Sequence, residues 1–301
     1  MNKFLKIYVV VLMIAASCTE RIDIKTNDAP PRLVIYGYIT SDTMQHSIRI
    51  TRSAGYFTTN RPEGVSDATV TVTDSNGKVI VFAENDTVPG LYQTAGDEYG
   101  EEGKTYRLDV HLDFDGDGNP EHYRASAYLQ HIHYIDSIRL EPSDFMPNSV
   151  EVRLFAKNTP TNENHFFTIF VAINDSVVNS NINRFFVIDN SMFRGMPYIY
   201  NVPCYFLNQD PDWEYRNEIL HVGDKVTLNM NAISKEYATF ISNVQSEIRP
   251  TIPIFGGPPA NVPTNIRCIE PNDKNPVSGF FTAFPSRYAH TWVKEEFSFK
   301  K

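Results

Sequence analysis

The chain has 301 residues, 42% of them hydrophobic, and a formal net charge of −9 at pH 7. This composition is typical of a globular protein and not of a disordered one. The acidic balance and the lack of any basic run disfavour nucleic acid and anionic membrane surfaces as partners of the folded body. The chain is long for one small sandwich, so we expect two domains.

The first residues have the features of a secretory signal peptide. Lys3 and Lys6 form a basic start, and an apolar run follows over residues 7–16, which is shorter than the roughly 20 residues that span a bilayer. Small residues directly precede Cys18, as in the lipobox of a bacterial lipoprotein, where this cysteine is acylated. We therefore predict a signal peptide over 1–17 and a lipid anchor on Cys18. The alternative is an ordinary signal peptide with an incidental cysteine.

Residues 18–31 are polar and end in two prolines, which predicts a short extended tether. Residues 32–130 predict an immunoglobulin-like or transthyretin-like β-sandwich. Its clearest part is ATVTVTDSNG at 68–77, where apolar residues alternate with threonines before a turn. Asn76 and Gly77 form the strongest short hairpin signal. Further strands are expected at 32–40, 48–52, 79–82, 106–112 and 123–129.

Residues 131–301 predict a second β-rich domain with one helix. The helix is expected near 234–249, because apolar residues recur there at helical spacing, Ser234 can cap the start and Pro250 stops it. The mostly apolar run FFTIFVAI at 166–173 predicts a buried strand. Other strands are expected at 132–140, 150–156, 183–188 and 225–230, with 277–284 and 291–299 closing the sheet of this domain.

Cys204 and Cys268 are the remaining cysteines. An exported chain meets an oxidising compartment, where two cysteines favour one disulfide. We therefore predict a Cys204–Cys268 disulfide, with two buried thiols as the alternative.

An acidic turn between two predicted strands is similar to the start of a calcium loop. Calcium takes six to eight oxygen ligands, and alternating aspartates present several carboxylates in one turn. An arginine occupies the place of the EF-hand glutamate, and the flanks are strands, so this is no EF-hand. The alternative is a solvated hairpin tip. The candidate ligands are Asp113, Asp115, Asp117, Asn119 and Glu121.

Two histidine pairs lie near this turn. His111 and His122 flank it symmetrically, so they face each other if the hairpin is centred there. His131 and His133 would share a face of one strand. Together these histidines could bind a transition metal, but cross-strand histidines more often line a polar face, and we assign no metal to them.

Residues 192–215 concentrate aromatic side chains among Asn, Pro and Asp. Aromatic rings on a loop can stack on sugars or anchor a protein partner. The alternative is that a long loop packs its rings inward to form a small core of its own. The candidate recognition residues are Tyr198, Tyr200, Trp213 and Tyr215, together with Phe255 in a Pro/Gly-rich loop.

The sequence assigns no catalytic residue. GVSDA at 64–68 only half resembles a nucleophile elbow, since its last residue is Ala. The sequence contains no zinc-protease motif, phosphate-binding glycine loop or dinucleotide fingerprint. We therefore expect no cofactor, apart from calcium at the acidic turn, and no enzymatic activity.

Several segments in a fixed order resemble those of a domain-of-unknown-function family of Bacteroidetes-type outer-membrane lipoproteins. They are LVIYGYIT, ATVTVTDSNG, GLYQT, GKTYRLDV, GDKVTLNMNAISKEYATF, PANVPTNI and PVSGFFTAF. Members of that family are often encoded beside TonB-dependent receptors. The resemblance implies an accessory protein of the outer membrane that assists nutrient capture. From the predicted anchor and the lack of enzyme motifs we expect it to act by binding, with an outer-membrane transporter, another envelope protein or a polysaccharide as its partner. The alternatives are a surface hydrolase acting on glycan or peptide, and a structural or adhesive lipoprotein.

Overall fold

The computed structural model describes residues 31–53, 61–248, 262–270 and 276–299, which fall within one compact unit. The protein is mainly β, with one α-helix in the described part of the chain, as the sequence predicts. The predicted signal peptide, Cys18, nearly all of the tether, Pro250 and Phe255 lie outside the described residues.

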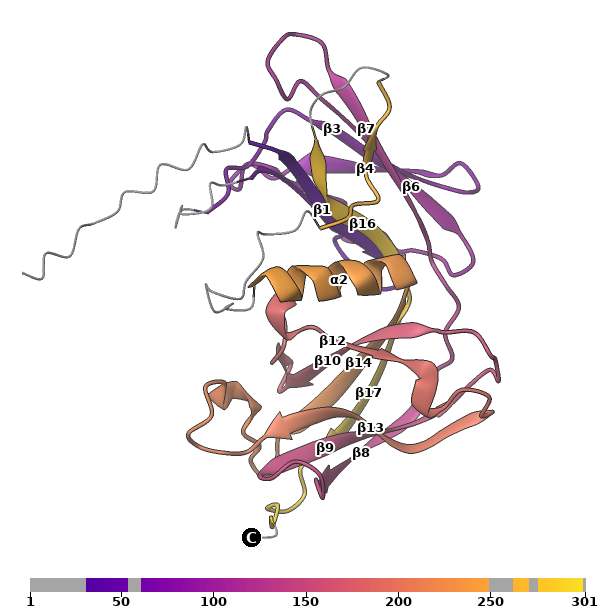
Figure 1. Ribbon diagram of the computed structural model, residues 1–301, viewed down its shortest axis with the longest axis vertical. Helices are drawn as coiled ribbons and strands as arrows, with labels where there is room; N and C mark the ends of the chain where they lie inside the picture. Colours follow the sequence, from indigo (N-terminus) through magenta and orange to yellow (C-terminus); the bar gives the residue numbers. More distant parts are fainter. Residues whose placement is uncertain (1–30, 54–60, 249–261, 271–275, 300–301) are drawn as a thin grey trace, which may run out of the picture. The chain divides into compact units, whose positions relative to one another are not determined.

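Nine strands form the first sheet, in the order β15-β7-β6-β3-β4-β5-β2-β1-β16 (Figure 1). Neighbouring strands are antiparallel except β1 and β16, which run parallel. The predicted hairpin joins β3 to β4, and Gly77 takes the positive φ of +89° that its turn requires. The bounds are β1 Leu33–Thr40, β2 Ser47–Arg52, β3 Thr69–Asp74, β4 Val79–Glu84, β5 Leu91–Gln93, β6 Thr105–Leu112, β7 Glu121–Tyr128, β15 Arg267–Cys268 and β16 Val277–Phe284.

The two halves of this sheet enclose one core, because alternate residues of each strand point to the same side. Ile35 and Ile50 from the β1 side pack in the same cluster as Val72, Leu108 and Val110 from the β6 side. β4 pairs with both β3 and β5 and so connects the halves. This is the sandwich that the alternation in the sequence predicts.

Two further sheets form a second sandwich. The strands β13-β9-β8 make one layer, and β11-β10-β14-β17 make the other, with β12 also paired to β10. Alternate residues of β9 and β10, such as Val152 and Ile169, meet in a second buried cluster. The bounds are β8 Ile135–Pro142, β9 Ser149–Lys157, β10 Phe166–Ile173, β11 Ser176–Val177, β12 Phe186–Asp189, β13 Tyr198–Asn208, β14 Lys225–Ile233 and β17 Ser286–Trp292, with short 3-10 helices at Ile182–Arg184, Asn190–Met192 and Arg216–Glu218.

The predicted helix is α2, Lys235–Ile248, directly after β14. Ser234 caps it as predicted, because its Oγ accepts the backbone N–H of Tyr237 at 3.1 Å. The helix buries Tyr237, Phe240 and Ile241 in a third cluster, against Phe280 of β16 and other apolar residues. Across the described ranges, no helix combines the length and the apolar character needed to cross a bilayer.

The third cluster draws on strands from both sandwiches. Phe280 and Phe284 come from β16 of the first sheet, whereas Phe166 comes from β10 of the second sandwich. The helix therefore packs against both.

The chain does not divide into its two sandwiches at residue 130 as expected. Residues 277–284 were expected to close the second sheet, but β16 pairs with β1 along its full length, from Leu33–Val277 to Thr40–Phe284. β15 likewise pairs with β7 of the first sheet. The first sandwich is therefore completed by a segment from near the end of the chain. An apolar strand can be recognised locally, but its partner depends on which sheet edge is open.

Candidate functional site

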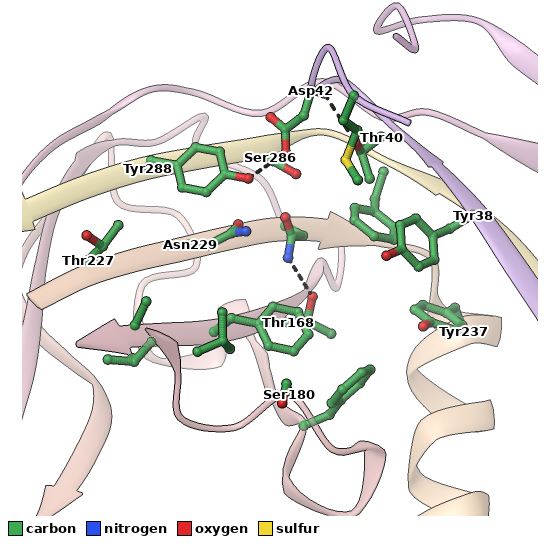
Figure 2. Close-up of a pocket in the computed structure, with 18 of the residues that line it drawn as sticks. Tyr38, Thr40, Asp42, Thr168, Ser180, Thr227, Asn229, Tyr237, Ser286 and Tyr288 are labelled. Atoms are coloured by element: carbon green, nitrogen blue, oxygen red, sulfur yellow. Dashed lines mark hydrogen bonds between the residues drawn. The ribbon is translucent and has the colours of Figure 1, made fainter. Parts of the chain in front are cut away.

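A cavity of about 390 Å³ lies between β1 of the first sandwich and β10, β14 and β17 of the second, beside the start of α2 (Figure 2). We call it the β1–β14 cavity. Its aromatic residues are Tyr36, Tyr38, Phe170, Phe185, Tyr237, Phe284 and Tyr288. Its polar residues are Thr40, Asp42, Thr168, Ser180, Thr227, Asn229, Asn231 and Ser286. The volume is within the usual range of small-molecule sites, about 300–1,000 Å³.

The polar wall of the cavity follows from the period of two in β14. Val226 and Leu228 point into the core of the second sandwich. The residues between and after them, Thr227, Asn229 and Asn231, point to the opposite face and line the cavity. The sequence KVTLNMNAI thus places an apolar row on one face of the strand and a polar row on the other.

Three side-chain atoms of this polar row have no hydrogen-bond partner in the described part of the protein, although they are buried. They are Oγ1 of Thr227, Oδ1 of Asn229 and Oδ1 of Asn231. Asn231 is only 1% exposed, and its Nδ2 donates to Oγ1 of Thr168 at 3.2 Å. A buried polar atom without a partner costs about 1–3 kcal/mol. A ligand that supplies the missing partners would recover part of this cost.

A pair of tyrosine hydroxyls closes the end of the cavity next to α2. The hydroxyl oxygens of Tyr36 and Tyr237 lie 2.6 Å apart, within hydrogen-bond distance. Burial is the largest cause of the raised pKa of both phenols, and it outweighs the lowering effect of the hydrogen bond on the pKa of Tyr36. Both groups are therefore neutral at physiological pH and can donate as well as accept.

Asp42 contributes a carboxylate to the wall, from the turn between β1 and β2. Its Oδ2 accepts the hydroxyl proton of Tyr288 on β17, and Figure 2 shows the two residues facing each other. Burial, followed by the hydrogen bond to Asp42, raises the pKa of Tyr288 above its ordinary value. This hydrogen bond joins the two sandwiches at the wall of the cavity.

This site was not predicted from the sequence. Its polar row was visible only as alternating polar residues in an expected strand, a pattern that is typical of a solvent-facing surface. The sandwich that covers this face is built from residues about 190 positions earlier in the chain, such as Tyr36 and Tyr38. The signal that could have indicated the site was the pair Asn229 and Asn231, two asparagines on the same face of one strand.

The predicted disulfide is not formed. Cys204 lies in the core of the second sandwich, where its Sγ donates to the carbonyl of Val152 at 3.1 Å. Cys268 lies in β15 of the first sheet, where its Sγ is 3.0 Å from Oε2 of Glu270. The two cysteines belong to different sandwiches, which spacing along the sequence does not reveal.

The acidic turn folds as a compact exposed hairpin tip. Carboxylate oxygens of Asp113, Asp115 and Asp117 all lie within 4.8 Å of one another. Asp113 accepts the backbone N–H groups of residues 116, 117 and 118. Glu121 is turned away to the buried base of the loop, where it accepts the N–H of Phe114 at 2.8 Å. The side chain of Asn119 binds Asp117. Calcium at this loop stays a prediction.

Of the two expectations about the histidine pairs, one is confirmed and the other is wrong. His111 and His122 are direct cross-strand partners as predicted, with ring centroids 4.0 Å apart. Nε2 of His122 lies 2.7 Å from a carboxylate oxygen of Asp109. The expectation of a shared strand face for His131 and His133 is wrong, because both residues lie in the irregular segment between β7 and β8.

The central part of the aromatic segment is a strand and not a loop. β13 spans Tyr198–Asn208, and Tyr205 packs into the second core, which favours the inward-packing alternative for part of the segment. Tyr200 is 72% exposed and lies edge-on to Phe155. Trp213, 41% exposed, lies edge-on to Tyr215, which in turn lies under the guanidinium of Arg184. None of these rings lines the β1–β14 cavity.

The fold and the site define a mainly β protein with two sandwiches and a ligand-sized cavity between strands of both. The chain belongs to the DUF4249 family, a domain of unknown function, whose profile matches residues 19–288. The comparison with curated proteins gives no match. Among solved structures, the chain is similar to the FN1–FN3 domains of chicken CNTN1, at 12% sequence identity and a TM-score of 0.24. That match covers 69% of this chain and 64% of the other, so it spans less than two thirds of that structure.

Proposed function

We propose that this protein captures a small molecule in the β1–β14 cavity, anchored by a lipid on Cys18 at the outer membrane, and assists a TonB-dependent transporter. The observation that carries the capture function is a row of buried polar atoms on β14 that have no partner within the described ranges and that face aromatic side chains across a cavity of about 390 Å³. Pockets of this size with mainly apolar walls and a few convergent polar groups are typical of ligand sites.

The groups on the cavity wall favour binding over catalysis. Apart from the carboxylate of Asp42 and the neutral phenols, the polar lining consists of amides and aliphatic hydroxyls. Such groups form directional hydrogen bonds without exchanging protons at neutral pH. General acid–base chemistry takes a titratable group whose pKa lies near the working pH. The proposal is therefore a binding protein and not a hydrolase.

The anchor and the transporter are supported by the sequence. The basic start, short apolar run and lipobox-like residues before Cys18 support acylation, and the resemblance to lipoproteins encoded beside TonB-dependent receptors supports the partner. A single acyl chain gives only marginal membrane binding, so stable attachment takes more than one. The tether predicted up to residue 31 would leave the folded body free to contact a transporter.

The experiment is affinity purification of the full chain from its native envelope in mild detergent. We expect the wild-type chain to sediment with the outer membrane, to co-purify with a transporter, and to release a small molecule detectable by mass spectrometry on denaturation. Cys18→Ala, as the matched variant, should leave the membrane fraction. A preparation without ligand and without a transporter would contradict the proposal.

A further inference from the structure

We infer that the β1–β14 cavity takes an uncharged, polyhydroxylated ring compound of the size of a mono- or disaccharide. This inference rests on the proposed function, because it names the ligand class of the same cavity. Three properties of the wall carry it: the spacing of the unpartnered atoms, the chemistry of the groups that face them, and the charge.

The unpartnered atoms form a row along one strand. Residues two positions apart in a strand are separated by about 6.8 Å, so the row from Thr227 to Asn231 extends over about 14 Å. Figure 2 shows Thr227 and Asn229 following each other along β14 toward the end where Tyr38 and Tyr237 lie. A ligand that satisfies this row must present polar groups at several points along its length. A compound with one polar head would leave most of the row unpaired.

The unpartnered atoms of the row call mainly for partners that donate, because the two asparagine atoms are amide oxygens, which only accept. The hydroxyl of Thr227 can do both, and an asparagine amide has an accepting oxygen and a donating nitrogen. Asn231 already uses its nitrogen on Thr168, so its oxygen is left to accept from the ligand. Ligand hydroxyl groups meet all of these requirements at once.

The aromatic residues of the cavity suit the apolar faces of a ring. Tyr38 and Phe284 lie with ring centroids 5.4 Å apart, and both line the cavity. Aromatic rings bury a large apolar area at defined geometry, and the C–H faces of a sugar ring offer a flat surface for such contacts. The hydroxyls around the rim of the same ring would remain available to the polar row.

The charge of the wall disfavours ionic ligands. The described residues that line the cavity include no Lys, Arg or His. An anion would therefore lose its hydration without gaining a cationic partner, which is costly in a buried site. A cation would find a single carboxylate, Asp42, one oxygen of which already accepts from Tyr288. Neutral amides and hydroxyls match a neutral ligand best.

The test is isothermal titration calorimetry on the full-length protein in a polyoxyethylene detergent, which has no sugar headgroup. The panel holds neutral saccharides (glucose, galactose, maltose and cellobiose), the charged analogues glucuronate and glucosamine, and a dipeptide. We expect at least one neutral saccharide to bind with a stoichiometry near one, and its charged analogue to bind at least about tenfold more weakly.

Two cavity variants and one control test whether the saccharide binds in the β1–β14 cavity. Asn229→Leu and Asn231→Leu should each lower the affinity for the saccharide by about tenfold, because each removes one hydrogen-bonding group from the row. Asn183→Leu changes an exposed asparagine outside the cavity and should leave the affinity unchanged. Thermal melts of all variants separate loss of binding from loss of folding.

The outcomes separate this inference from the proposed function. If the dipeptide or a charged compound binds with the same dependence on Asn229, capture stands and the saccharide class is overturned. If no saccharide binds while the envelope-purified protein releases another small molecule, the saccharide class is overturned and the capture function stands. If no compound binds and the purified protein releases nothing, both are overturned.

Discussion

Tyr36 and Tyr237 are 201 positions apart in the chain, yet their hydroxyl oxygens lie 2.6 Å from each other. Tyr36 lies on β1 of the first sandwich, and Tyr237 lies in the first turn of α2, directly after β14. Their hydrogen bond ties the two sandwiches together at one end of the β1–β14 cavity. The same residues thus contribute to stability and to the shape of the proposed site.

Removing one hydroxyl of this pair should cost more than removing both. Tyr237→Phe leaves the hydroxyl of Tyr36 in a buried position without its partner, and we expect the free energy of unfolding to fall by about 1–3 kcal/mol. The double variant Tyr36→Phe/Tyr237→Phe should recover part of the loss. Urea unfolding of both single variants and the double variant gives the coupling energy. Additive losses would show that the two hydroxyls do not interact.

Asn229→Leu should weaken ligand binding without lowering the stability of the protein. The change removes a buried oxygen that has no partner among the described residues and replaces it with an apolar group of similar size. We expect the melting temperature of the ligand-free protein to be unchanged or higher, while binding weakens. Such a split is typical of a functional residue kept at a cost to stability. A clear drop in melting temperature would instead assign Asn229 to the fold.

Gly279→Ala should destabilise the first sandwich strongly. Gly279 has a φ of +100°, and a Cβ there would lie 1.9 Å from the carbonyl oxygen of Ile35. We expect a loss of about 3 kcal/mol or more, because the parallel pairing of β1 and β16 must shift. Gly77→Ala is the matched control, since φ is +89° but no atom of the described residues lies within 4 Å, and it should cost only about 1–2 kcal/mol. Equal losses in denaturant unfolding would contradict the steric explanation.

Stability should fall at alkaline pH, in part through Tyr205. Burial, followed by the nearby charge of Glu218, raises the pKa of Tyr205 to about 12. A tyrosine titrates near pH 10 in the unfolded chain, so its contribution is complete below pH 10 and is lost as the pH rises toward 12. In Tyr205→Phe, unfolding free energies measured from pH 9 to 12 should fall less steeply. Tyr200→Phe, at an exposed position, is the control, and an unchanged slope for Tyr205→Phe would refute the assignment.

Cys204 should resist modification in the folded protein. Its thiol is buried, and burial raises its pKa to about 12, so the reactive thiolate is scarce at neutral pH. Peptide mapping after alkylation should find Cys204 labelled only when the chain is unfolded first. A reductant should leave the melting temperature unchanged. A Cys204–Cys268 peptide in the non-reduced map would contradict the structure.

Local sequence patterns predicted the strands and the helix well, but they did not predict which strands pair with each other. The alternation of ATVTVT and the turn at Asn76 and Gly77 were sufficient for the β3–β4 hairpin, because a two-residue period and a positive φ are local properties. The cap at Ser234 and the apolar stripe after it were sufficient for α2. The same kind of signal could not show that β16 lies beside β1, since that pairing brings together strands more than 240 residues apart.

The candidate site was predicted least well. The aromatic residues were visible in the sequence, but Tyr205 entered the second core, whereas Tyr200 and Trp213 remained exposed in places that do not line a cavity. The cavity instead uses Tyr38 and the polar row of β14, which looked like solvent-facing positions. Whether an outward face of a strand meets water or another sandwich is decided by contacts distant in sequence.

The sequence by itself determined the β-rich class, the hairpin, the capped helix and the membership in a family, because these depend on local periodicity, turn chemistry and the order of segments. Only the tertiary structure decided that Cys204 and Cys268 lie in different sandwiches, that β16 completes the first sheet, and that Asn229 and Asn231 face a cavity. The physical reason is that burial is a property of two surfaces in contact, and a strand specifies only one of them.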